Sequence, residues 1–593
     1  MIQIKSMFMK SYLSRHSTKT HIEKNLCIIL ICLCFVSIFS CSNLTSDPSG
    51  ISDVHDSISI SIDEIFHEWS YPETPGGSVT IVQDGKIIFM KGFGSADLEM
   101  SVPVGPSTKF YLASISKQFT GYCIANLIVA EKLSLDDDIR EYIPEMQSFQ
   151  DPVRIRDLVF QKSGLRDLYG LLPLTGFHLN DHLSNSEVLN MLYKQEGLNF
   201  PTGDKWQYSN SNYFLLGEIV KRVTGISLAE WAEKNVFTPL GMKNTYFVDS
   251  IGLIVPDRAK SYHQDRDGSF SNDPFLDVTV GHTGLYSTAE DMSKWLIHLH
   301  HMIKNGDPVL EIMLQTDTLN NGDEMNSYSF GLFKSSNNAI QYWHRGSLFG
   351  YKSIISYYPE QDFGLVILGN VQSFNRIRYA REITRLFYPD LVARRTEQAI
   401  HSPVPDSFVN TGIHIDPKIL KKYEGNYVVD PMTVYVVCVR NDLIFLYEVG
   451  DSDTTRLIAI APDQFRNDEN SLLVSFFEDN EGLVDSMCYQ TATLKATCTK
   501  ANILSSPQED EIVGNYYNGE LEIYVTIEKN EDYLVAGNPR LGKFELYSTF
   551  ENEFRCNHDF FSYISFYRGV SEHIEGFLLE GFSVSNIKFV KRE

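Results

Sequence analysis

Two short apolar runs near residue 80 predict a β-hairpin. Residues 78–82 (SVTIV) and 86–90 (KIIFM) are rich in β-branched and aromatic side chains, as strands usually are. Asp84-Gly85 between them is a strong turn signal. A helix is expected just before the hairpin, over about residues 60–69.

The central part of the chain has the helical spacing of apolar residues. From about residue 110 to residue 320 the helical segments are broken by loops rich in Gly, Pro and Asn. Strand-like runs return between residues 339 and 368, and an amphipathic helix is expected at Arg376–Phe387. The outer segments can therefore form one sheet with helices packed against it, and the middle would be a helical insertion. This arrangement predicts an α/β fold of two lobes with a cleft between them.

The C-terminal third has the pattern of short β-strands. Residues 391–416 are polar and contain proline, as a linker does, and beyond them apolar and polar residues alternate. A five-residue pattern, Tyr423–Tyr427 (YEGNY), recurs later as Ile512–Tyr516 (IVGNY). Each copy opens a strand-rich segment, so residues 417–593 form either two related β-modules or the halves of one barrel. The candidate modules are residues 417–507 and 508–593.

The first residues have the features of an export signal. An apolar run at residues 26–39 follows a basic segment and has the length of a signal-peptide core, which is short for a membrane-spanning helix. The run ends at Cys41 after a small residue, which resembles the lipobox of bacterial lipoproteins. That resemblance implies a signal peptide at residues 1–41, a lipid on Cys41, and a tether at 42–56 that holds the protein at the bacterial cell envelope, facing the periplasm or the cell surface. An ordinary cleaved signal peptide and a short anchor helix are the alternatives, and all three export the remaining chain.

Composition and charge narrow the classes of function. The 593 residues are too many for one ordinary core. A formal net charge of −25 argues against a nucleic-acid partner, because phosphate binding needs a basic face. No Cys/His spacing suggests a zinc site, so neither a metal nor another cofactor is expected. An oxidising compartment would permit a Cys488–Cys498 bridge, although the sequence does not establish the pairing.

Ser114 and Lys117 are the first candidates for chemistry. They are three residues apart in a segment (YLASISKQF) that leads into a helix, so they share one helix face. A serine hydroxyl needs a base to act as a nucleophile, and a buried lysine with a lowered pKa can be that base. Alone, S-x-x-K is a weak signal, because a chain of this length contains it by chance.

Two further motifs follow along the chain. Tyr208 and Asn210, in the loop sequence QYSN, could exchange the serine proton and orient the lysine; a loop tyrosine and a capping asparagine are the alternative. His344 and Gly346, in the sequence HRGS, follow an apolar strand. A donor or cation there could hold a substrate carboxylate, and the glycine allows close backbone approach. A lone histidine after a strand is more often structural, so each motif is ambiguous by itself.

Taken together, S-x-x-K, Y-S-N and H-x-G in this order resemble the serine β-lactamase and penicillin-binding-protein superfamily, and Y-S-N resembles its class C β-lactamase-like branch. That branch also contains D,D-carboxypeptidases, D-amino-acid peptidases and esterases. The likeness covers residues 57–390. Further family-like segments are Lys132–Asp137, Leu215–Ile219, Val223–Gly225, Pro239–Met242, Gly284–Asp291 and Gly364–Asn370. The resemblance implies a two-lobed β-lactamase-like domain, with an antiparallel sheet flanked by helices plus a helical lobe, followed by one or more lipocalin-like β-modules.

The resemblance also implies roles for the residues of the first two motifs. Ser114 would be the acylated nucleophile, with Lys117 as its partner. Tyr208 would act as general base and acid, and Asn210 would orient the lysine and the substrate. The reaction implied is acyl transfer through a serine ester that water then releases.

The third motif and one neighbouring segment depart from the family pattern. His344 stands where penicillin-hydrolysing class C enzymes carry lysine, which favours the peptidase side of the family. His344 and Gly346 would still contribute to substrate binding, and the backbone N–H groups of Ser114 and Ser347 would form the oxyanion hole. Gln161 stands where many relatives have histidine, in a segment that usually reads T-H-x-S-G-L. We expect that change to alter local packing or specificity.

These observations predict a cell-envelope serine hydrolase that acts on peptide or amide bonds, including those of D-amino acids. Within the enzyme class, an esterase or a weak β-lactamase is the alternative. A non-catalytic lipoprotein that binds or senses peptidoglycan is the alternative from another class. The expected partners are a small peptide, amide or ester substrate and the membrane that holds the lipid anchor.

Overall fold

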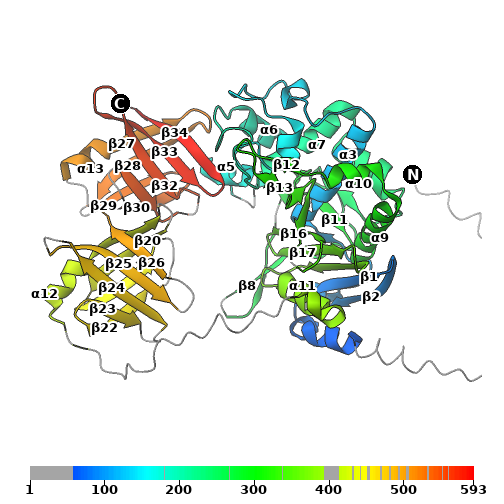
Figure 1. Ribbon diagram of the computed structural model, residues 1–593, viewed down its shortest axis with the longest axis horizontal. Coiled ribbons are helices and arrows are strands. Elements are labelled where there is room, and N and C mark those ends of the chain that lie inside the picture. The colour runs from blue at the N-terminus through cyan, green and yellow to red at the C-terminus, as the bar shows by residue number, and fades with distance from the viewer. Residues whose placement is uncertain are drawn as a thin grey trace, which may run out of the picture. The chain divides into compact units, whose positions relative to one another are not determined.

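The computed structural model describes most of residues 58–592. The residues outside the description are 1–57, 179–180, 266, 275, 337, 393–412, 414, 431–432, 441, 450–453, 468–470, 480–481, 492–494, 502–505, 531–532, 550–551, 559 and 593. The chain divides into two units, Met1–Ser61 and Ile62–Glu593. The described residues of the first unit, 58–61, are helical. The second unit contains an α/β domain and two β-barrels (Figure 1).

A seven-stranded antiparallel sheet forms the centre of the α/β domain. Its strands are β1 (Gly77–Gln83), β2 (Lys86–Phe93), β14 (Tyr328–Ser329), β15 (Leu332–Ser335), β16 (Gln341–Leu348), β17 (Tyr351–Tyr358) and β18 (Phe363–Gly369). They lie in the order β14-β15-β16-β17-β18-β1-β2, so the N-terminal hairpin pairs with the last strand of the domain, as the sequence predicts. Strands β1, β17 and β18 are buried at nearly every position, which means that both faces of the sheet are covered.

Helices form the second lobe and also cover the sheet. They are α3 (Ser116–Val129), α4 (Ile155–Val159), α5 (Leu168–Leu174), α6 (Asn185–Tyr193), α7 (Asn210–Thr224), α8 (Leu228–Ala232), α9 (Ala289–Asn305), α10 (Pro308–Met313) and α11 (Arg376–Phe387). Most positions of α3 are buried, and α3 packs against α7 and α10 at the centre of the helical lobe. Helix α9 packs on β1 and β18, and α11, which has the predicted bounds, packs on β17 and β18.

Short strands and turns connect these elements. The strands are β3 (Ser95–Asp97), β4 (Val102–Pro103), β5 (Phe110–Tyr111), β6 (His182–Leu183), β7 (Tyr246–Phe247), β8 (Tyr262–Gln264), β9 (Phe270–Asn272), β10 (Leu276–Asp277), β11 (Leu285–Ser287), β12 (Asp317–Thr318) and β13 (Glu324–Met325). The short 3-10 helices are η1 (His67–Trp69), η2 (Ala113–Ile115), η3 (Ile139–Glu141) and η5 (Pro389–Leu391), and η4 (Glu233–Phe237) is a short π-helix. Strand β11 pairs with both β5 and β7, which brings the chain just before α3 against the chain just before α9.

Two closed eight-stranded antiparallel barrels follow the α/β domain. The first consists of β19 (Gly425–Asp430), β20 (Thr433–Arg440), β21 (Leu443–Glu448), β22 (Thr455–Ala461), β23 (Gln464–Asn467), β24 (Leu472–Glu478), β25 (Val484–Thr491) and β26 (Lys495–Lys500). The second consists of β27 (Gly514–Asn518), β28 (Ile523–Asn530), β29 (Tyr533–Asn538), β30 (Gly542–Ser548), β31 (Glu553–Cys556), β32 (Tyr563–Arg568), β33 (Ile574–Gly581) and β34 (Val584–Arg592). Helices α12 (Pro417–Leu420) and α13 (Ser506–Ile512) and turn η7 (Lys421–Tyr423) precede them.

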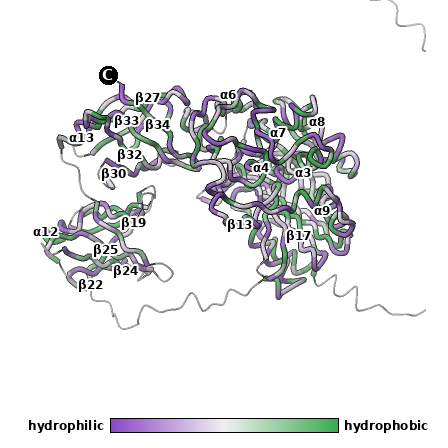
Figure 2. The backbone as a smooth tube through the Cα atoms, turned by 45° about the horizontal axis from the view of Figure 1, so that its top comes forward, coloured by the Kyte–Doolittle hydropathy of each residue, from purple (hydrophilic) through white to green (hydrophobic). Residues whose placement is uncertain are grey.

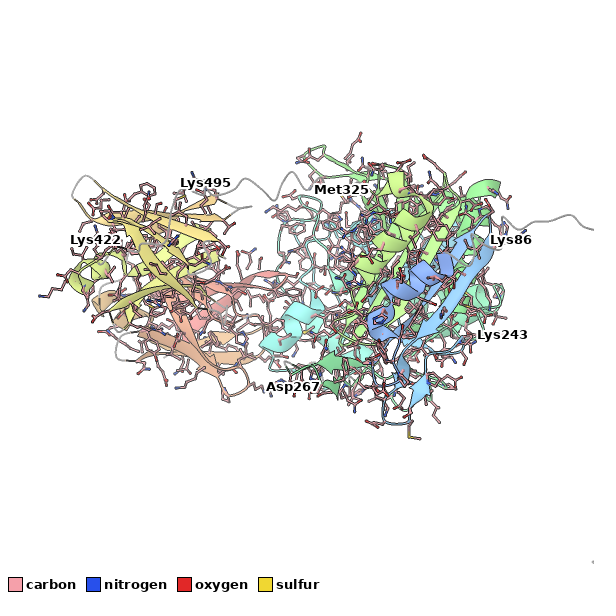
Figure 3. All side chains as sticks on the ribbon, turned by 90° about the horizontal axis from the view of Figure 1, so that it is seen from below. Lys86, Lys243, Asp267, Met325, Lys422 and Lys495 are labelled. Atoms are coloured by element: carbon pink, nitrogen blue, oxygen red, sulfur yellow. The ribbon has the colours of Figure 1, made fainter. Side chains whose placement is uncertain are left out.

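Burial alternates along barrel strands such as β24 and β28, as expected for strands with one face in a core. Figure 2 shows hydrophobic and hydrophilic residues intermixed along both barrels. Lysines lie on the outside of both kinds of domain: Figure 3 labels Lys422 and Lys495 on the first barrel and Lys86 and Lys243 on the α/β domain. The predicted architecture, an antiparallel sheet with helices and a helical lobe followed by β-rich modules, is confirmed. Of the two arrangements that the sequence left open for the C-terminal region, the structure has two barrels rather than two halves of one.

The five-residue repeat has the same local structure in both barrels. Gly425 and Gly514 have nearly identical φ angles, 148° and 149°. The repeat tyrosine donates a hydrogen bond to the carbonyl four residues earlier in each copy, at 2.8 Å in Tyr427 and 2.5 Å in Tyr516. A lysine from the last strand of each barrel lies over that tyrosine ring, at 5.7 and 5.8 Å. The two barrels therefore share a closure motif that the sequence repeat marks.

The register of the first barrel argues against the Cys488–Cys498 bridge. Cys488 pairs with Thr497 and Cys498 pairs with Met487 across β25 and β26. Side chains of neighbouring strand positions point to opposite faces, so the two thiols lie on opposite sides of the sheet. Both are free in the structure, and the bridge that oxidation would have permitted is not formed.

Several expectations fall outside the described residues. The signal peptide, Cys41 and the tether lie within residues 1–57, and most of the linker lies within 393–412. In the described part of the chain, no helix combines the length and the apolar character needed to span a bilayer. The same residues contain no cluster of His, Cys, Asp or Glu that could hold a metal ion.

Candidate active site

Ser114 lies at the start of the central helix of the helical lobe. It belongs to turn η2, which runs directly into α3. Ala113 before it has a left-handed backbone with φ of 48°, which costs a non-glycine residue about 1–2 kcal/mol. Such strain is common where a functional side chain must be presented in a fixed orientation. Ala113 and Ile115 are buried, whereas Ser114 keeps partial exposure.

Lys117 brings three segments of the chain together. Its Nζ lies 3.1 Å from Ser114 Oγ, 2.8 Å from Asn210 Oδ1 and 2.8 Å from the carbonyl oxygen of His282. The lysine is completely buried. The sequence motifs of Ser114, Lys117 and Asn210 therefore meet at one atom, and the His282 carbonyl is a partner that the sequence did not reveal.

Burial controls the charge of Lys117. Loss of water around the amine holds the pKa of Lys117 well below its usual range, and the carboxylate of Asp167 opposes this shift only in part. A neutral amine has two N–H donors and one lone pair. Asn210 Oδ1 and the His282 carbonyl accept both donors, so the lone pair of the neutral amine is directed at the hydroxyl of Ser114. This is the geometry of a general base.

Asp167 is a member of the site that sequence reasoning missed. Its Oδ2 accepts hydrogen bonds from the backbone N of Asn210 at 2.5 Å and from Asn210 Nδ2 at 2.9 Å. The carboxylate is 1% exposed, and burial raises its pKa although these donors and Lys117 work against the shift. Asp167 thus fixes the orientation of the Asn210 amide, with Nδ2 toward Asp167 and Oδ1 toward Lys117. The only sequence signal was an aspartate placed to cap α5, which is common in helices of any function.

Gln161 holds the loop that carries Tyr208. The backbone N of Gln207 donates to the Gln161 carbonyl at 2.9 Å, and that of Ser209 donates to Gln161 Oε1 at 2.9 Å. Asn212 Nδ2 also donates to Oε1, at 2.5 Å. Gln161 is completely buried and has a left-handed backbone with φ of 62°. The residue that departs from the family pattern therefore positions the segment on both sides of Tyr208, which is a packing role.

Tyr208 lies between Lys117 and the third motif. Lys117 Nζ is 4.9 Å from the centre of its ring, and the His344 ring is 6.3 Å away. Burial, followed by the nearby Tyr328, raises the pKa of Tyr208 well above its usual value, and a hydrogen bond with Ser114 opposes the shift. Tyr208 is thus protonated at neutral pH in the free protein, as a proton donor would be. Its dual role as general base and acid stays a prediction.

Gly346 lets the third motif approach the nucleophile. A Cβ atom at this position would lie 2.0 Å from the carbonyl oxygen of Leu112, two residues before Ser114, so only glycine fits. Strand β15 pairs with β16 only over Gln341–Trp343. Among the described residues, no strand pairs with that edge of β16 at His344–Leu348. That edge includes Ser347, and β16 packs against turn η2, which carries Ser114. The oxyanion hole of Ser114 and Ser347 N–H groups stays a prediction.

His344 is placed in the site but does not act there as a cation. It is 2% exposed, and its Nδ1 lies 2.7 Å from the carbonyl oxygen of Arg345. Burial, and then the charge of Lys117, lower the pKa of His344 to about 3, so the imidazole is neutral at neutral pH. The neutral ring packs there against Tyr208, Tyr328 and Phe333. The role of His344 in holding a substrate carboxylate stays a prediction.

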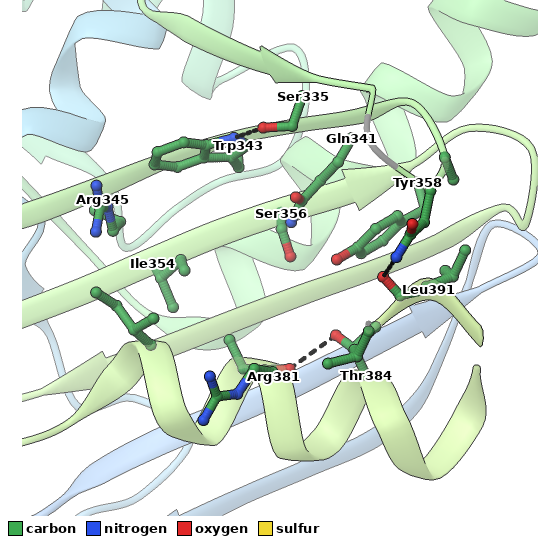
Figure 4. A pocket seen from close by; sticks show the side chains of 15 residues that line it. Ser335, Gln341, Trp343, Arg345, Ile354, Ser356, Tyr358, Arg381, Thr384 and Leu391 are labelled. Atoms are coloured by element: carbon green, nitrogen blue, oxygen red, sulfur yellow. Dashed lines mark hydrogen bonds between the residues drawn. The ribbon is translucent and has the colours of Figure 1, made fainter. Parts of the chain in front are cut away.

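A cavity on the other face of strand β16 is separate from the candidate site. It has a volume of about 530 Å³ and is lined by Trp343, Arg345 and residues of α11 such as Arg381 (Figure 4). Successive strand residues point to opposite faces, so Arg345 faces this cavity while His344 faces the nucleophile. The guanidinium of Arg345 lies 4.8 Å from the Trp343 ring.

Known proteins resemble this chain over the α/β domain. Residues 67–386 match the family model described as Beta-lactamase. The chain is similar to protein flp of Staphylococcus aureus (strain N315), with 28% identity over 319 residues, 53% of this chain and 63% of that protein. It is similar to a D-aminopeptidase of Gluconobacter oxydans (strain 621H), with 26% identity over 310 residues, 52% of this chain and 58% of that protein.

Among solved structures, an octameric penicillin-binding protein homologue from Pyrococcus abyssi has a TM-score of 0.49 and 22% identity, covering 76% of this chain and 100% of that one. The match to the two curated relatives spans less than two thirds of the length of each. The family model, in contrast, covers more than half of this chain and contains all three motifs. The resemblance inferred from the motifs is confirmed: the chain belongs to the Beta-lactamase family.

Proposed function

We propose that this member of the family is an exported, lipid-anchored serine hydrolase of the cell envelope that forms an acyl-enzyme on Ser114. Its substrates would be peptides or amides, including those of D-amino acids. The observation that carries the proposal is the position of Lys117, whose buried amine contacts Ser114 Oγ and two carbonyl oxygens at once. A protein that only binds ligands has no need of a buried amine directed at a serine hydroxyl.

The contacts support a specific sequence of proton transfers. Neutral Lys117 takes the proton of Ser114 while Oγ forms a bond to the substrate carbonyl carbon. Tyr208 donates its hydroxyl proton to the leaving nitrogen as the C–N bond breaks, and Lys117 returns its extra proton to Tyr208. Water then attacks the ester by the reverse relay and releases the acid. In this scheme Asn210 holds the lysine, and Asp167 holds Asn210.

Two observations favour amides over β-lactams. His344 stands at the position of the third-motif lysine and is neutral, so the cation that penicillin-hydrolysing relatives carry there is missing. A curated relative is a D-aminopeptidase. Esters remain chemically accessible, because an ester needs less proton donation to its leaving group than an amide does.

Labelling with a fluorophosphonate probe tests the proposal. We expect the full chain to form a covalent adduct on Ser114, located by mass spectrometry, and Ser114→Ala to form none. Ser116→Ala is a matched control, because Ser116 lies two residues away, is buried and bonds the Ala113 carbonyl. Turnover of N-acetyl-D-Ala-D-Ala, p-nitrophenyl acetate and nitrocefin then ranks amide, ester and β-lactam substrates. Equal labelling of wild type and Ser114→Ala would contradict the proposal.

The proposed lipid anchor at the membrane is tested separately. In cells, the wild type should incorporate a radiolabelled fatty acid and sediment with membranes, and Cys41→Ser should do neither. Labelling that persists in Cys41→Ser would contradict a lipid at this cysteine, whatever the outcome at Ser114.

A further inference from the structure

The second barrel contacts the loop that holds the catalytic residues. Arg166, which precedes Asp167, donates through Nε to the Ser585 carbonyl at 2.9 Å and through Nη2 to the Asn586 carbonyl at 2.7 Å. Its Nη1 forms an ion pair with Glu520. The Arg166 side chain is 1% exposed. A buried guanidinium with this many partners marks a specific interface rather than an incidental touch.

Other groups continue the same interface. Asn199 Oδ1 accepts from the Ser585 backbone N at 2.7 Å, and Asn199 Nδ2 donates to the Ser583 carbonyl at 3.1 Å. The backbone N of Asp167 donates to that carbonyl at 3.2 Å. A Cβ atom on Gly170 would lie 2.1 Å from the Phe582 carbonyl oxygen, so this close approach requires glycine. The turn at 582–583 and the start of β34 thus fit closely against the segment at 166–170, which contains Asp167.

An open cavity lies beside the interface and includes Ser347 of the third motif. The cavity has a volume of about 690 Å³. The α/β domain contributes Ser347 and Lys352, from the end of the strand pair that faces the nucleophile. The second barrel contributes Arg540, His558 and Phe560. A substrate whose scissile carbonyl lies at Ser114 and Ser347 would extend into this cavity.

Cations dominate the charge of this cavity. Lys352 Nζ donates to Ser347 Oγ at 2.7 Å, and Arg540 Nη1 donates to the Thr175 carbonyl at 2.7 Å. In the described part of the chain, no carboxylate lies within ion-pair distance of either side chain. Asp273 also lines the cavity, but burial and the neighbouring Arg376 still lower the pKa of Lys352 to about 8. Two cations against one carboxylate are notable in a chain of net charge −25, since they would attract an anion.

We propose that Arg540 of the second barrel and Lys352 of the α/β domain form a subsite for a carboxylate group of the substrate. The proposal rests on the proposed function, because it places this subsite next to an acylated Ser114. A guanidinium recognises a carboxylate through paired N–H donors, and Lys352 adds a second charge from the opposite wall. The second barrel is then a specificity element and not only a stabilising module.

Protection of Ser114 from a fluorophosphonate tests the subsite without requiring turnover. The competitors are four D-Ala-D-Ala derivatives, with a succinyl or acetyl group at the N-terminus and a free acid or amide at the C-terminus. We expect a carboxylate at one of these ends to lower the protecting concentration about tenfold relative to its neutral counterpart. Arg540→Gln should abolish that preference, Arg540→Lys should retain most of it, and Arg540→Glu should reverse it.

Controls separate the subsite from folding and from the chemistry. Lys543→Gln removes a cation three residues away that pairs with Glu528 outside the cavity, and should leave the preference unchanged. Lys352→Met, on the α/β-domain side of the cavity, should also weaken the preference for a carboxylate. Loss of labelling in the wild type would contradict the proposed function itself. Normal labelling with equal protection by charged and neutral competitors, or a preference that survives in Arg540→Gln, would overturn the subsite alone.

Discussion

The carboxylate of Asp167 accepts two hydrogen bonds from Asn210, one from the backbone N at 2.5 Å and one from Nδ2 at 2.9 Å. These bonds leave Oδ1 of Asn210 turned toward Lys117, 2.8 Å from Nζ. Asp167 touches neither the nucleophile nor, in the proposed scheme, the substrate. It acts as a positioning residue, and its charge also raises the pKa of the lysine against the effect of burial.

Replacing Asp167 with Asn should therefore have two effects. Asn210 donates both of its bonds to Oδ2, and the Tyr169 backbone N donates to Oδ1. The NH2 group of an amide would therefore oppose a buried N–H donor in either orientation, so we expect kcat to fall about tenfold or more with little change in KM. Loss of the negative charge should also shift the acid limb of the pH profile to lower pH. Asp204→Asn, at an exposed aspartate bonded to Asn320, is the control. A fall in kcat without any shift of the limb would indicate a purely steric role.

The pH dependence of acylation should report Lys117. Its pKa is lowered by burial, so the amine is neutral over a range where a free lysine is charged, and the lone pair that accepts the Ser114 proton is present there. As pH falls through the Lys117 pKa the amine gains a proton, and kcat/KM should decrease tenfold per pH unit. Pre-steady-state acylation of Ser114 measures this limb directly.

His344 is the other nearby group whose protonation could cause an acid limb in the pH profile of acylation. Its pKa is lowered to about 3, so it stays neutral from pH 5 upward and should not contribute. His344→Asn should keep the position of the limb even if it lowers the rate. A limb that disappears in His344→Asn would contradict the assignment of Lys117 as the base.

Gln161→Ala tests whether the departure from the family pattern supports Tyr208. The substitution removes Oε1, which accepts bonds from the Ser209 backbone N and from Asn212 Nδ2. Leaving these buried donors without a partner should destabilise the protein by about 1–3 kcal/mol. Tyr208 should then be less well placed, and kcat should fall about tenfold. The control is Gln147→Ala, at an exposed glutamine that donates to the Tyr193 carbonyl; similar losses in both variants would contradict a specific role for Gln161.

Local periodicity predicted much of the fold. The hairpin around Asp84 and the helix Arg376–Phe387 could be predicted because apolar spacing and turn residues determine the structure of a few neighbouring residues. The motif order predicted that Ser114, Lys117 and Asn210 meet, because the resemblance supplied the long-range contact. The sequence did not predict whether the C-terminal strands form one barrel or two. A barrel closes only when its first and last strands pair, and these strands are far apart in the sequence.

The features of the site that the sequence did not reveal share a physical cause. The charge of His344 depends on burial by Tyr208 and by Tyr328 and Phe333, which come from two separate segments, since the last two residues pair within the β14–β15 hairpin. Asp167 and the His282 carbonyl were missed for the same reason: an aspartate at a helix cap and a backbone oxygen have no sequence signature of function. Residue types indicate chemistry, whereas protonation and orientation depend on the tertiary surroundings.

The ion pair between Arg166 and Glu520 gives a last prediction, on the attachment of the second barrel. Glu520→Ala leaves the Arg166 charge buried, at 1% exposure, without its partner, which costs about 3–5 kcal/mol. Opening of the interface should therefore become about a hundredfold or more frequent, measured as faster hydrogen exchange at residues 583–586. Arg166→Met combined with Glu520→Met should restore much of the protection, because no buried charge then remains unpaired.

Glu522→Ala is the matched control. Its pair with Lys194 lies between the same parts of the chain but is exposed on both sides, and such a pair contributes about 0–1 kcal/mol. If Glu520→Ala and Glu522→Ala change the exchange equally, the buried pair does not hold the barrel against the catalytic loop.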